Sequence, residues 1–279
     1  MQSGDFAQLA HVKHLALDMD GTLYRGGTLF DCTLPFLESM LELGIGVTYL
    51  TNNSSKSVDD YLAHLQQMGI SAAAEQLFTS ATGTIEYLRK ENPDWQRLYV
   101  LGTKSLRKEF AQHGYILIDP DSQQPPDAVV VAFDKELAYD RFCKAGYWIQ
   151  QGKPFIATHP DLVCPTDEPT LLIDCGALTA CLVAATGRSP DLVLGKPHAV
   201  MLDGILRRHG LAPRELAMVG DRLATDVAMA NQAKTVGVLV LTGEARAADV
   251  DQSTPRPDLV VDDLAELGRL LLRARNDAG

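Results

Sequence analysis

The sequence predicts an α/β protein built on a parallel sheet. Short, continuous apolar runs alternate with amphipathic helical patterns over the first 70 residues, as in strands joined by helical crossovers. The same alternation returns in the middle and in the last third of the chain. Acidic residues also follow two of the predicted strands, and ligands bind at the carboxyl ends of strands in open α/β sheets.

The first 70 residues predict strand, helix, strand and helix in that order. Residues 11–19 contain a short apolar run typical of a strand buried on both faces. Residues 35–43 have helical spacing that stops at Gly44. Residues 45–50 repeat the buried-strand pattern, and residues 57–68 predict the second helix.

The remaining elements follow the same alternation. The predicted strands are residues 98–101, 128–133, 154–158, 192–194, 216–219 and 235–241. The predicted helices are residues 104–113, 139–151, 177–186, 199–209, 225–231 and 264–273. Residues 159–169 are rich in turn formers and predict a loop.

Length, composition and charge exclude several classes of protein. The chain has 279 residues, enough for one large domain or two modest ones, and 46% of them are hydrophobic. Its net charge of −11 argues against nucleic acid or an anionic membrane as its main partner. No apolar run approaches the ~20 residues of a spanning helix, and the first residues lack the apolar core of a signal peptide. The five cysteines form no C-x-x-C pair, which indicates reduced thiols and a cytoplasmic protein.

Two carboxylates end the first predicted strand. Asp18 and Asp20 are two residues apart, so they face the same way if the strand continues through them. Carboxylates placed together repel one another unless a cation or a proton holds them. Taken alone, the pair is also compatible with an ordinary strand-to-turn junction.

A second acidic pair, Asp221 and Asp226, follows the strand predicted at residues 216–219. If this strand lies beside the first, Asp18, Asp20 and Asp221 converge. Such a group of oxygen ligands suits Mg²⁺. The alternative is that one of these acids merely caps the following helix. This alternative is more plausible for Asp226 than for Asp221.

Two further segments suit an anionic ligand. Residues 51–55 place a hydroxyl and successive backbone N–H groups before a helix, which is either an anion seat or a polar loop with a helix cap. Lys196, fixed between Gly195 and Pro197, is either a positive centre for the site or an exposed surface lysine. Agreement among the four segments favours a phosphate-handling site.

With these motifs in this order, the chain resembles the haloacid dehalogenase superfamily of phosphohydrolases. Within it, the chain is most similar to subfamily IIA, the NagD-like and p-nitrophenyl-phosphatase-like group. The resemblance runs from about residue 14 to residue 265. It rests on DMDGT at 18–22, TNNSSKS at 51–57, FDKELAYD at 133–140, PFIATHPDLVCPT at 154–166, ATGRSP at 185–190, GKP at 195–197, GDRLATD at 220–226 and LTGEA at 241–245.

The resemblance implies a Rossmann-like core with an inserted cap domain. The core would comprise residues 1–80 and 190–279. The cap would comprise residues 81–189, as an α/β cap of type two that covers the active site and chooses the substrate.

The resemblance also implies the chemistry of the site. Asp18 would attack phosphorus and form an aspartyl-phosphate. Asp20 would protonate the leaving alcohol and then activate water. Mg²⁺ would be held by Asp18, Asp221 and the backbone carbonyl of Asp20. Asp226 corresponds to the family's second acidic position, which orients the metal shell or Lys196.

The same resemblance implies the phosphate contacts. Thr51, the Asn52 amide and Lys196 would bind the phosphoryl oxygens, with Asn53 and Gly21 beside them.

The cap departs from the family pattern at one position. Family members often read T-N-P-D where this chain has T-H-P-D at 158–161. His159 and Asp161 are therefore candidate substrate contacts. His159 is expected either to alter the leaving-group pocket or to be an exposed loop residue.

The leading hypothesis is a Mg²⁺-dependent phosphomonoesterase of a small metabolite such as a nucleotide, a sugar phosphate or phosphoglycolate. A phosphotransferase or phosphomutase with the same aspartyl-phosphate is the main alternative. A phosphate-binding protein without turnover is another, although such a protein gains nothing from an acid–base residue at Asp20. The dinucleotide fingerprint and the phosphate loop of nucleoside triphosphatases are both missing from the sequence. Related caps often form homodimers, but no stripe of residues here requires one.

Overall fold

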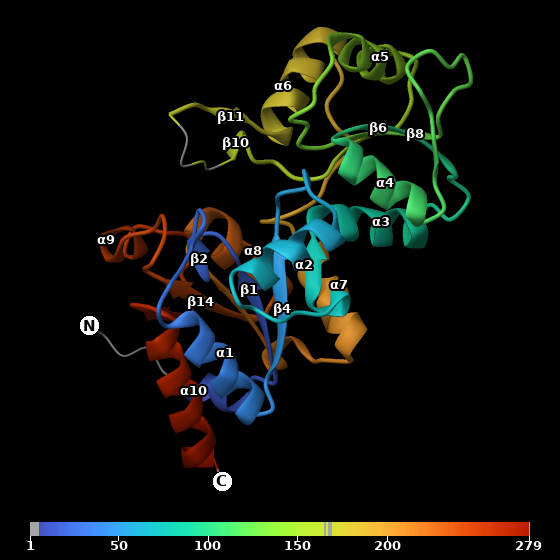
Figure 1. Cartoon of the computed structure of the whole chain (residues 1–279). Helices are drawn as coiled ribbons and strands as arrows, with labels where there is room; N and C mark the ends of the chain where they lie inside the picture. The colour runs from blue at the N-terminus through green and yellow to red at the C-terminus, as the bar shows by residue number, and fades with distance from the viewer. Residues whose placement is uncertain (1–5, 165, 167–168, 279) are drawn as a thin grey trace. The chain divides into compact units, whose positions relative to one another are not determined.

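The computed structural model describes residues 6–164, 166 and 169–278, and it divides into two units. The core unit contains Met1–Leu50, Leu62–Phe78 and Lys196–Gly279. The inserted unit contains Thr51–Tyr61 and Thr79–Gly195. Each unit is built around its own parallel sheet, as the alternation of strands and helices predicts (Figure 1).

A six-stranded sheet organises the core unit, in the order β15-β14-β13-β1-β4-β5. Its strands are β1 (His14–Asp18), β4 (Gly46–Thr51), β5 (Leu77–Thr79), β13 (Leu216–Gly220), β14 (Val236–Val240) and β15 (Leu259–Val261). β1 pairs in parallel with β13 on one side and with β4 on the other. Every residue of β1 is buried, because helices cover both faces of the sheet.

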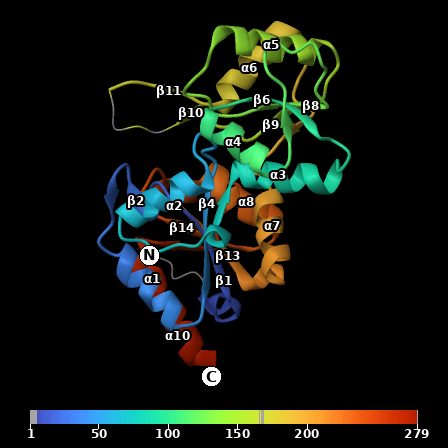
Figure 2. The same cartoon turned by 45° about the vertical axis from the view of Figure 1, so that its right-hand side comes forward.

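Two pairs of helices cover the core sheet. α1 (Thr33–Glu42) packs against α10 (Leu264–Ala278), and α7 (Val200–His209) packs against α8 (Ala228–Ala233). Figure 2 shows the two pairs on opposite sides of the sheet. Apolar residues of α7 and α8 form one core cluster with β1 and β13, which includes Ala16, Met201 and Met218.

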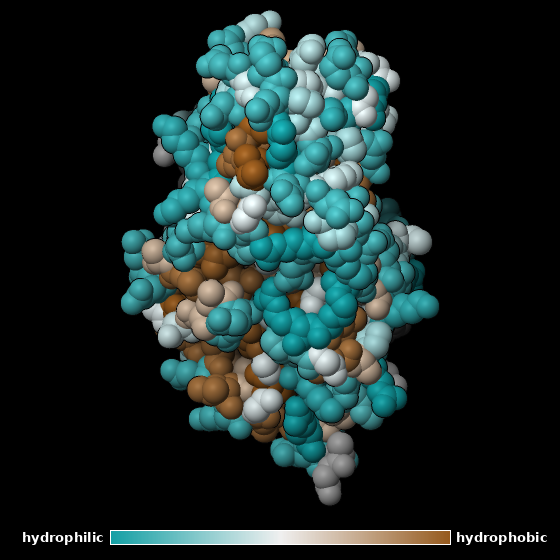
Figure 3. Space-filling view, turned by 90° about the vertical axis from the view of Figure 1, so that its right-hand side faces the viewer, coloured by the Kyte–Doolittle hydropathy of each residue, from teal (hydrophilic) through white to brown (hydrophobic). Residues whose placement is uncertain are grey.

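The inserted unit has a five-stranded parallel sheet, in the order β12-β9-β8-β6-β7. Its strands are β6 (Arg97–Leu101), β7 (Ile116–Leu117), β8 (Ala128–Val131), β9 (Phe155–Ala157) and β12 (Leu192–Val193). Its helices are α3 (Ser80–Glu91), α4 (Lys104–Gln112), α5 (Tyr139–Gln150) and α6 (Cys175–Thr186). α5 and α6 pack on this sheet around Trp148 and Phe155. Figure 3 shows a face of the molecule that is largely hydrophilic with separate apolar patches.

α2 (Val58–Gln67) begins in the inserted unit and ends in the core unit. Three short elements complete the core: β2 (Tyr24–Arg25), β3 (Thr28–Leu29) and α9 (Ala247–Val250). In the inserted unit, β10 (Val163–Cys164) and β11 (Leu172–Ile173) form an antiparallel pair. Short 3-10 turns cover Phe6–His11, Ala74–Gln76 and Pro213–Glu215.

Several elements differ from the sequence-based predictions. α3, β5 and β15 are not predicted at all, and the loop predicted at 159–169 contains β10. The helix predicted at 225–231 is instead a π-helix, Leu223–Val227, followed by α8. Pro165, Asp167 and Glu168 of the predicted loop lie outside the described residues, as do residues 1–5 of the segment tested for a signal peptide.

None of the described helices combines the length and apolar character that crossing a membrane would require. All five cysteines, each of which lies in a described segment, are free thiols.

Candidate active site

Three carboxylates meet at the carboxyl ends of β1 and β13. Asp18 is the last residue of β1, and Asp221 follows directly after β13. The two strands are neighbours in the sheet, so their ends lie together. Asp226 comes from the π-helix that follows. One ligand oxygen from each acid lies within 4.8 Å of the others, and all three side chains are buried.

Lys196 supplies the positive charge of this cluster. Its ammonium forms ion pairs with Asp18 and with Asp226, and Nζ lies 2.7 Å from Asp226 Oδ1. The side chain is 5% exposed, which excludes the reading of Lys196 as a surface lysine. Burial alone would lower the pKa of this ammonium, but the charges of Asp18 and Asp226 outweigh burial and raise it.

The cluster carries more negative than positive charge. Burial, together with the nearby charge of Asp18, raises the pKa of Asp221 to about 6. Burial also raises the pKa of Asp226 to about 7, and the attraction of Lys196 only partly offsets it. A divalent cation would remove this conflict, because it favours the ionised form of every carboxylate around it.

The donor set fits Mg²⁺. Asp221 Oδ2 accepts the backbone N–H of Glu244 at 2.7 Å, whereas the buried Oδ1 has no hydrogen-bond partner among the described residues. A buried carboxylate oxygen without a partner suits a metal ligand. A side chain at Gly21 or Gly243 would collide with the Asp221 carboxylate, so these glycines leave room for it.

Asp20 is exposed, and its carboxylate is not part of the three-acid cluster, where Asp226 takes the place expected for it. It stands in a turn in which Gly21 has φ +90° and donates its N–H to Tyr24 O. Gly21, which is expected beside the phosphate, therefore already uses its N–H within this turn. An exposed carboxyl beside a buried one suits proton exchange with water.

Sequence reasoning missed the residues that hold this turn. Thr242 Oγ1 donates to Gly21 O at 2.6 Å, and Thr22 Oγ1 donates to Asp18 Oδ2 at 3.4 Å. The LTGEA motif at 241–245 was the available signal, but a motif does not reveal which group it contacts.

The last residue of β4 and the segment that follows it form an ordered polar turn in the inserted unit. Thr51 Oγ1 accepts the N–H of Asn53 at 3.1 Å. Asn53 Oδ1 accepts two hydrogen bonds from Ser55, so this side chain mainly fixes the turn. Asn52 is buried, and its Nδ2 donates to Asp161 Oδ2 at 3.1 Å.

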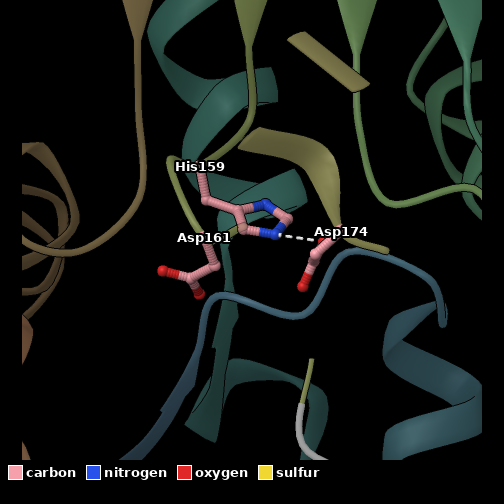
Figure 4. Close-up of side chains that lie close together, drawn as sticks. All are labelled: His159, Asp161 and Asp174. Carbon is pink, nitrogen blue, oxygen red and sulfur yellow. Dashed lines mark hydrogen bonds and ion pairs between the residues drawn. The ribbon is translucent and has the colours of Figure 1, made fainter. Parts of the chain in front are cut away.

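His159 is fully buried, so the expectation of an exposed loop histidine is wrong. Its Nε2 lies 2.8 Å from Asp174 Oδ1 (Figure 4). Its Nδ1 lies 2.9 Å from Thr158 Oγ1. In a neutral ring that donates from Nε2 to the Asp174 carboxylate, Nδ1 accepts from the Thr158 hydroxyl. His159, Asp161 and Asp174 offer ligand atoms within 4.8 Å of one another, but both ring nitrogens are already satisfied without a metal.

The glycine before Lys196, Gly195, stands in a crowded and left-handed position. Its φ is +72°, and a Cβ there would lie 2.6 Å from His159 Cβ and 2.8 Å from Asn52 Oδ1. The close approach of these two residues therefore requires glycine at this position.

Comparisons with known proteins identify the family of this chain. A family model described as haloacid dehalogenase-like hydrolase matches residues 15–116. A second model, described as HAD-hydrolase-like, matches residues 193–267. The two matches include the segments that carry Asp18, Asp20, Lys196, Asp221 and Asp226.

Relatives that match more than nine-tenths of this chain carry the names of phosphatases. The 5'-nucleotidase YutF of Bacillus subtilis is 30% identical over 91% of this chain and 96% of its own length. The crystal structure of 4-nitrophenylphosphatase from Thermotoga maritima has a TM-score of 0.88 and 39% identity, covering 94% of this chain and 98% of that one. Glycerol phosphate phosphatase from Mycobacterium tuberculosis, in complex with magnesium, has a TM-score of 0.84 and 30% identity, covering 97% of this chain and 78% of that one.

Proposed function

Since the chain belongs to the haloacid dehalogenase-like hydrolases, in the NagD-like group of subfamily IIA, we propose that it is a Mg²⁺-dependent phosphomonoesterase of small phosphorylated metabolites. The observation that carries the proposal is the buried cluster of Asp18, Asp221 and Asp226 around Lys196 at two strand ends. The match to a hydrolase family and the relatives named as phosphatases support the hydrolysis of phosphate esters as the class of reaction.

The proposed reaction has two steps. Asp18 attacks phosphorus, the bond to the ester oxygen breaks, and Asp20 gives its proton to the leaving alcohol. Asp20 then takes a proton from water, which attacks the aspartyl-phosphate and releases inorganic phosphate. Asp18 and Asp20 thereby return to their starting states, so the cycle consumes one water per ester.

The metal site is proposed from the donor set. Asp18, Asp221 and the backbone carbonyl of Asp20 would hold Mg²⁺, with Asp226 orienting the shell or Lys196. When bound, Mg²⁺ screens the negative nucleophile from the negative phosphate. The unpartnered Oδ1 of Asp221 supports this assignment.

The phosphate contacts are proposed for Lys196, Thr51 and the Asn52 amide. Lys196 stays charged at neutral pH because its carboxylate neighbours raise its pKa. Its ammonium can therefore stabilise the charge that develops on the phosphoryl oxygens. Leu50 of β4 pairs with Asp18 of β1, and Thr51 is the next residue along the chain. This register supports the proposal that Thr51 contacts the same phosphoryl group as Asp18.

The substrate class rests on what the named relatives share. Their names specify a nucleotide, 4-nitrophenyl phosphate and glycerol phosphate, which are all phosphomonoesters with different alcohols. We propose Asp161, held by Asn52, as a contact for the alcohol part. His159 would act as a positioning residue, because its ring has no free nitrogen for a substrate.

The test is phosphate release from p-nitrophenyl phosphate with Mg²⁺, with EDTA, and with Asp18→Asn. Turnover that vanishes with EDTA and in Asp18→Asn, but persists in the matched control Asp203→Asn, would support the proposal. A folded, Mg²⁺-loaded protein that is silent on this ester and on a panel of metabolite phosphates would refute hydrolysis.

A further inference from the structure

A second site is suggested by a cleft on the core unit, away from the cluster of Asp18, Asp221 and Asp226. The cleft has a volume of about 360 Å³, which falls within the range of small-molecule sites. It lies where β14 begins, at Val236, and beside the turn that leads into β13. Asp18 and Asp221 are at the opposite, carboxyl ends of the strands, so the two sites are distinct.

The lining of this cleft is basic in an acidic protein. Arg214, Lys234 and Arg256 line it with His11, and Asp258 is the single acid among its lining residues. The whole chain has 36 acidic residues against 25 basic ones. Acids outnumber bases in the chain as a whole, but bases outnumber acids in this cleft. Its three cations come from separate elements, so the basic character of the cleft is a local feature.

Within the described part of the chain, the cations of the cleft form no close ion pairs, although Arg214 lies near enough to Glu215 for its charge to help lower the pKa of that carboxyl. Neither Arg214 nor Lys234 forms an ion pair within 4 Å among residues 6–164, 166 and 169–278. Arg256 donates to the backbone oxygen of Asp251, which leaves its charge unpaired. Asp258 is already engaged, since its Oδ2 accepts the N–H of Gly237 at 2.7 Å.

We propose that this cleft binds a small organic polyanion, such as a polycarboxylate or a polyphosphate, as an effector. Guanidinium and ammonium groups are the side chains that recognise both kinds of oxyanion. A ligand with two or more negative charges can reach Arg214 and Lys234 together, whereas a single small anion leaves most of the 360 Å³ empty.

The cleft is joined to the catalytic site through one helical segment. Val227 and Asn231 line the cleft, and Asp226, which pairs with Lys196, immediately precedes Val227. The segment begins as a π-helix, a strained form often found at functional sites, and continues as α8. A ligand that packs against Val227 and Asn231 can therefore shift the position of the Asp226 carboxylate.

Calorimetric titration tests binding directly. The probes are tricarballylate, a tricarboxylate, and methylenediphosphonate, which cannot be hydrolysed. The test variant is Arg214→Ala/Lys234→Asn, because asparagine tolerates the left-handed backbone at Lys234, where φ is +58°. The control is Arg269→Ala/Lys108→Asn, which removes two exposed charges outside the cleft.

We expect at least one probe to bind the wild type and the control, with affinity at least about tenfold weaker in the test variant. The tighter probe identifies the oxyanion. Equal affinity in the test variant, or no binding of either probe at millimolar concentration, would overturn the site. Both altered residues are exposed, and Lys234→Asn alone serves if the double variant does not fold.

The effector role has its own readout. A saturating amount of the bound probe should change kcat or KM for p-nitrophenyl phosphate in the wild type and not in the test variant. Unchanged kinetics in the wild type would overturn the effector role. Binding is read without turnover, so failure of the proposed phosphatase reaction would leave the titration result intact.

Discussion

The Lys196 ammonium lies 2.7 Å from Asp226 Oδ1 in a site where both side chains are almost completely removed from water. Lys196 also pairs with Asp18, so one cation is shared by two acids that come from different elements. Such a pair is costly to break, because the remaining charge stays buried without compensation. We therefore expect Asp226 to act by holding Lys196 in place.

Asp226→Asn should weaken Mg²⁺ binding. The amide keeps the shape of the side chain but removes a negative charge within 4.8 Å of Asp18 and Asp221. Substituting a residue that holds the metal ligands in place typically weakens metal binding by about 10- to 100-fold. The Mg²⁺ concentration for half-maximal phosphatase activity should rise by that factor. Asp203→Asn is the control, and an unaltered Mg²⁺ dependence in Asp226→Asn would contradict this role.

Metal-free protein should lose stability as the pH rises. The folded pKa values of Asp221 and Asp226 are raised to about 6 and about 7, above their ordinary value of 3.8. A raised folded pKa means that stability is fully present below the unfolded pKa and is lost as the pH passes the folded one. In EDTA, the Tm should therefore fall between pH 5 and pH 8.

Adding Mg²⁺ should raise the Tm more at pH 8 than at pH 5, because the ion binds the ionised carboxylates. Asp221→Asn should flatten the pH dependence in EDTA relative to Asp203→Asn. Two results would contradict the raised pKa values of Asp221 and Asp226: the same Tm in EDTA at both pH values, or a larger Mg²⁺ effect at pH 5.

The strand-end acids could be predicted because their signal is local. A buried strand pattern followed by DMDGT places Asp18 at the end of β1, and the same logic places Asp221 after β13. α3 escaped prediction although Ala81, Ile85 and Leu88 share its buried face. Thr84 interrupts that apolar stripe, and only the structure shows its hydroxyl donating to Ser80 O.

His159 could not be interpreted from its neighbours in sequence. Its partner Asp174 is 15 residues further along the chain, beyond the β10–β11 pair. A histidine in a turn-rich segment is ordinarily exposed. Burial depends on this long-range contact, which no local pattern encodes.

Glu109→Gln should stabilise the protein at alkaline pH. Glu109 is 3% exposed, and its carboxyl has little compensation beyond a hydrogen bond from the backbone of Val58, which only partly offsets burial. Burial raises its pKa to about 7 from 4.5, so the ionised form destabilises the folded state above pH 7. The gain in unfolding free energy at pH 8.5 should be up to about 3 kcal/mol, and it should disappear near pH 4.5.

Urea unfolding at both pH values measures the effect of Glu109→Gln. Glu38→Gln, an exposed change on α1, is the matched control and should have little effect at either pH. A gain at pH 4.5 as large as the gain at pH 8.5 would point to better packing of the amide and not to the cost of a buried charge.

His159→Asn should lower stability and weaken substrate binding while leaving the chemical step largely intact. Asparagine is the residue that the family often has here, but its shorter side chain cannot reach both Thr158 Oγ1 and Asp174 Oδ1, which the imidazole bridges at 2.9 and 2.8 Å. Leaving the buried Asp174 without this donor should cost about 1–3 kcal/mol of unfolding free energy. KM for p-nitrophenyl phosphate should rise with kcat nearly unchanged, because His159 is expected to position Asp161 and not the reacting groups. His198→Asn, on the exposed surface, is the control. A fall in kcat with unchanged KM would instead assign His159 to the chemical step.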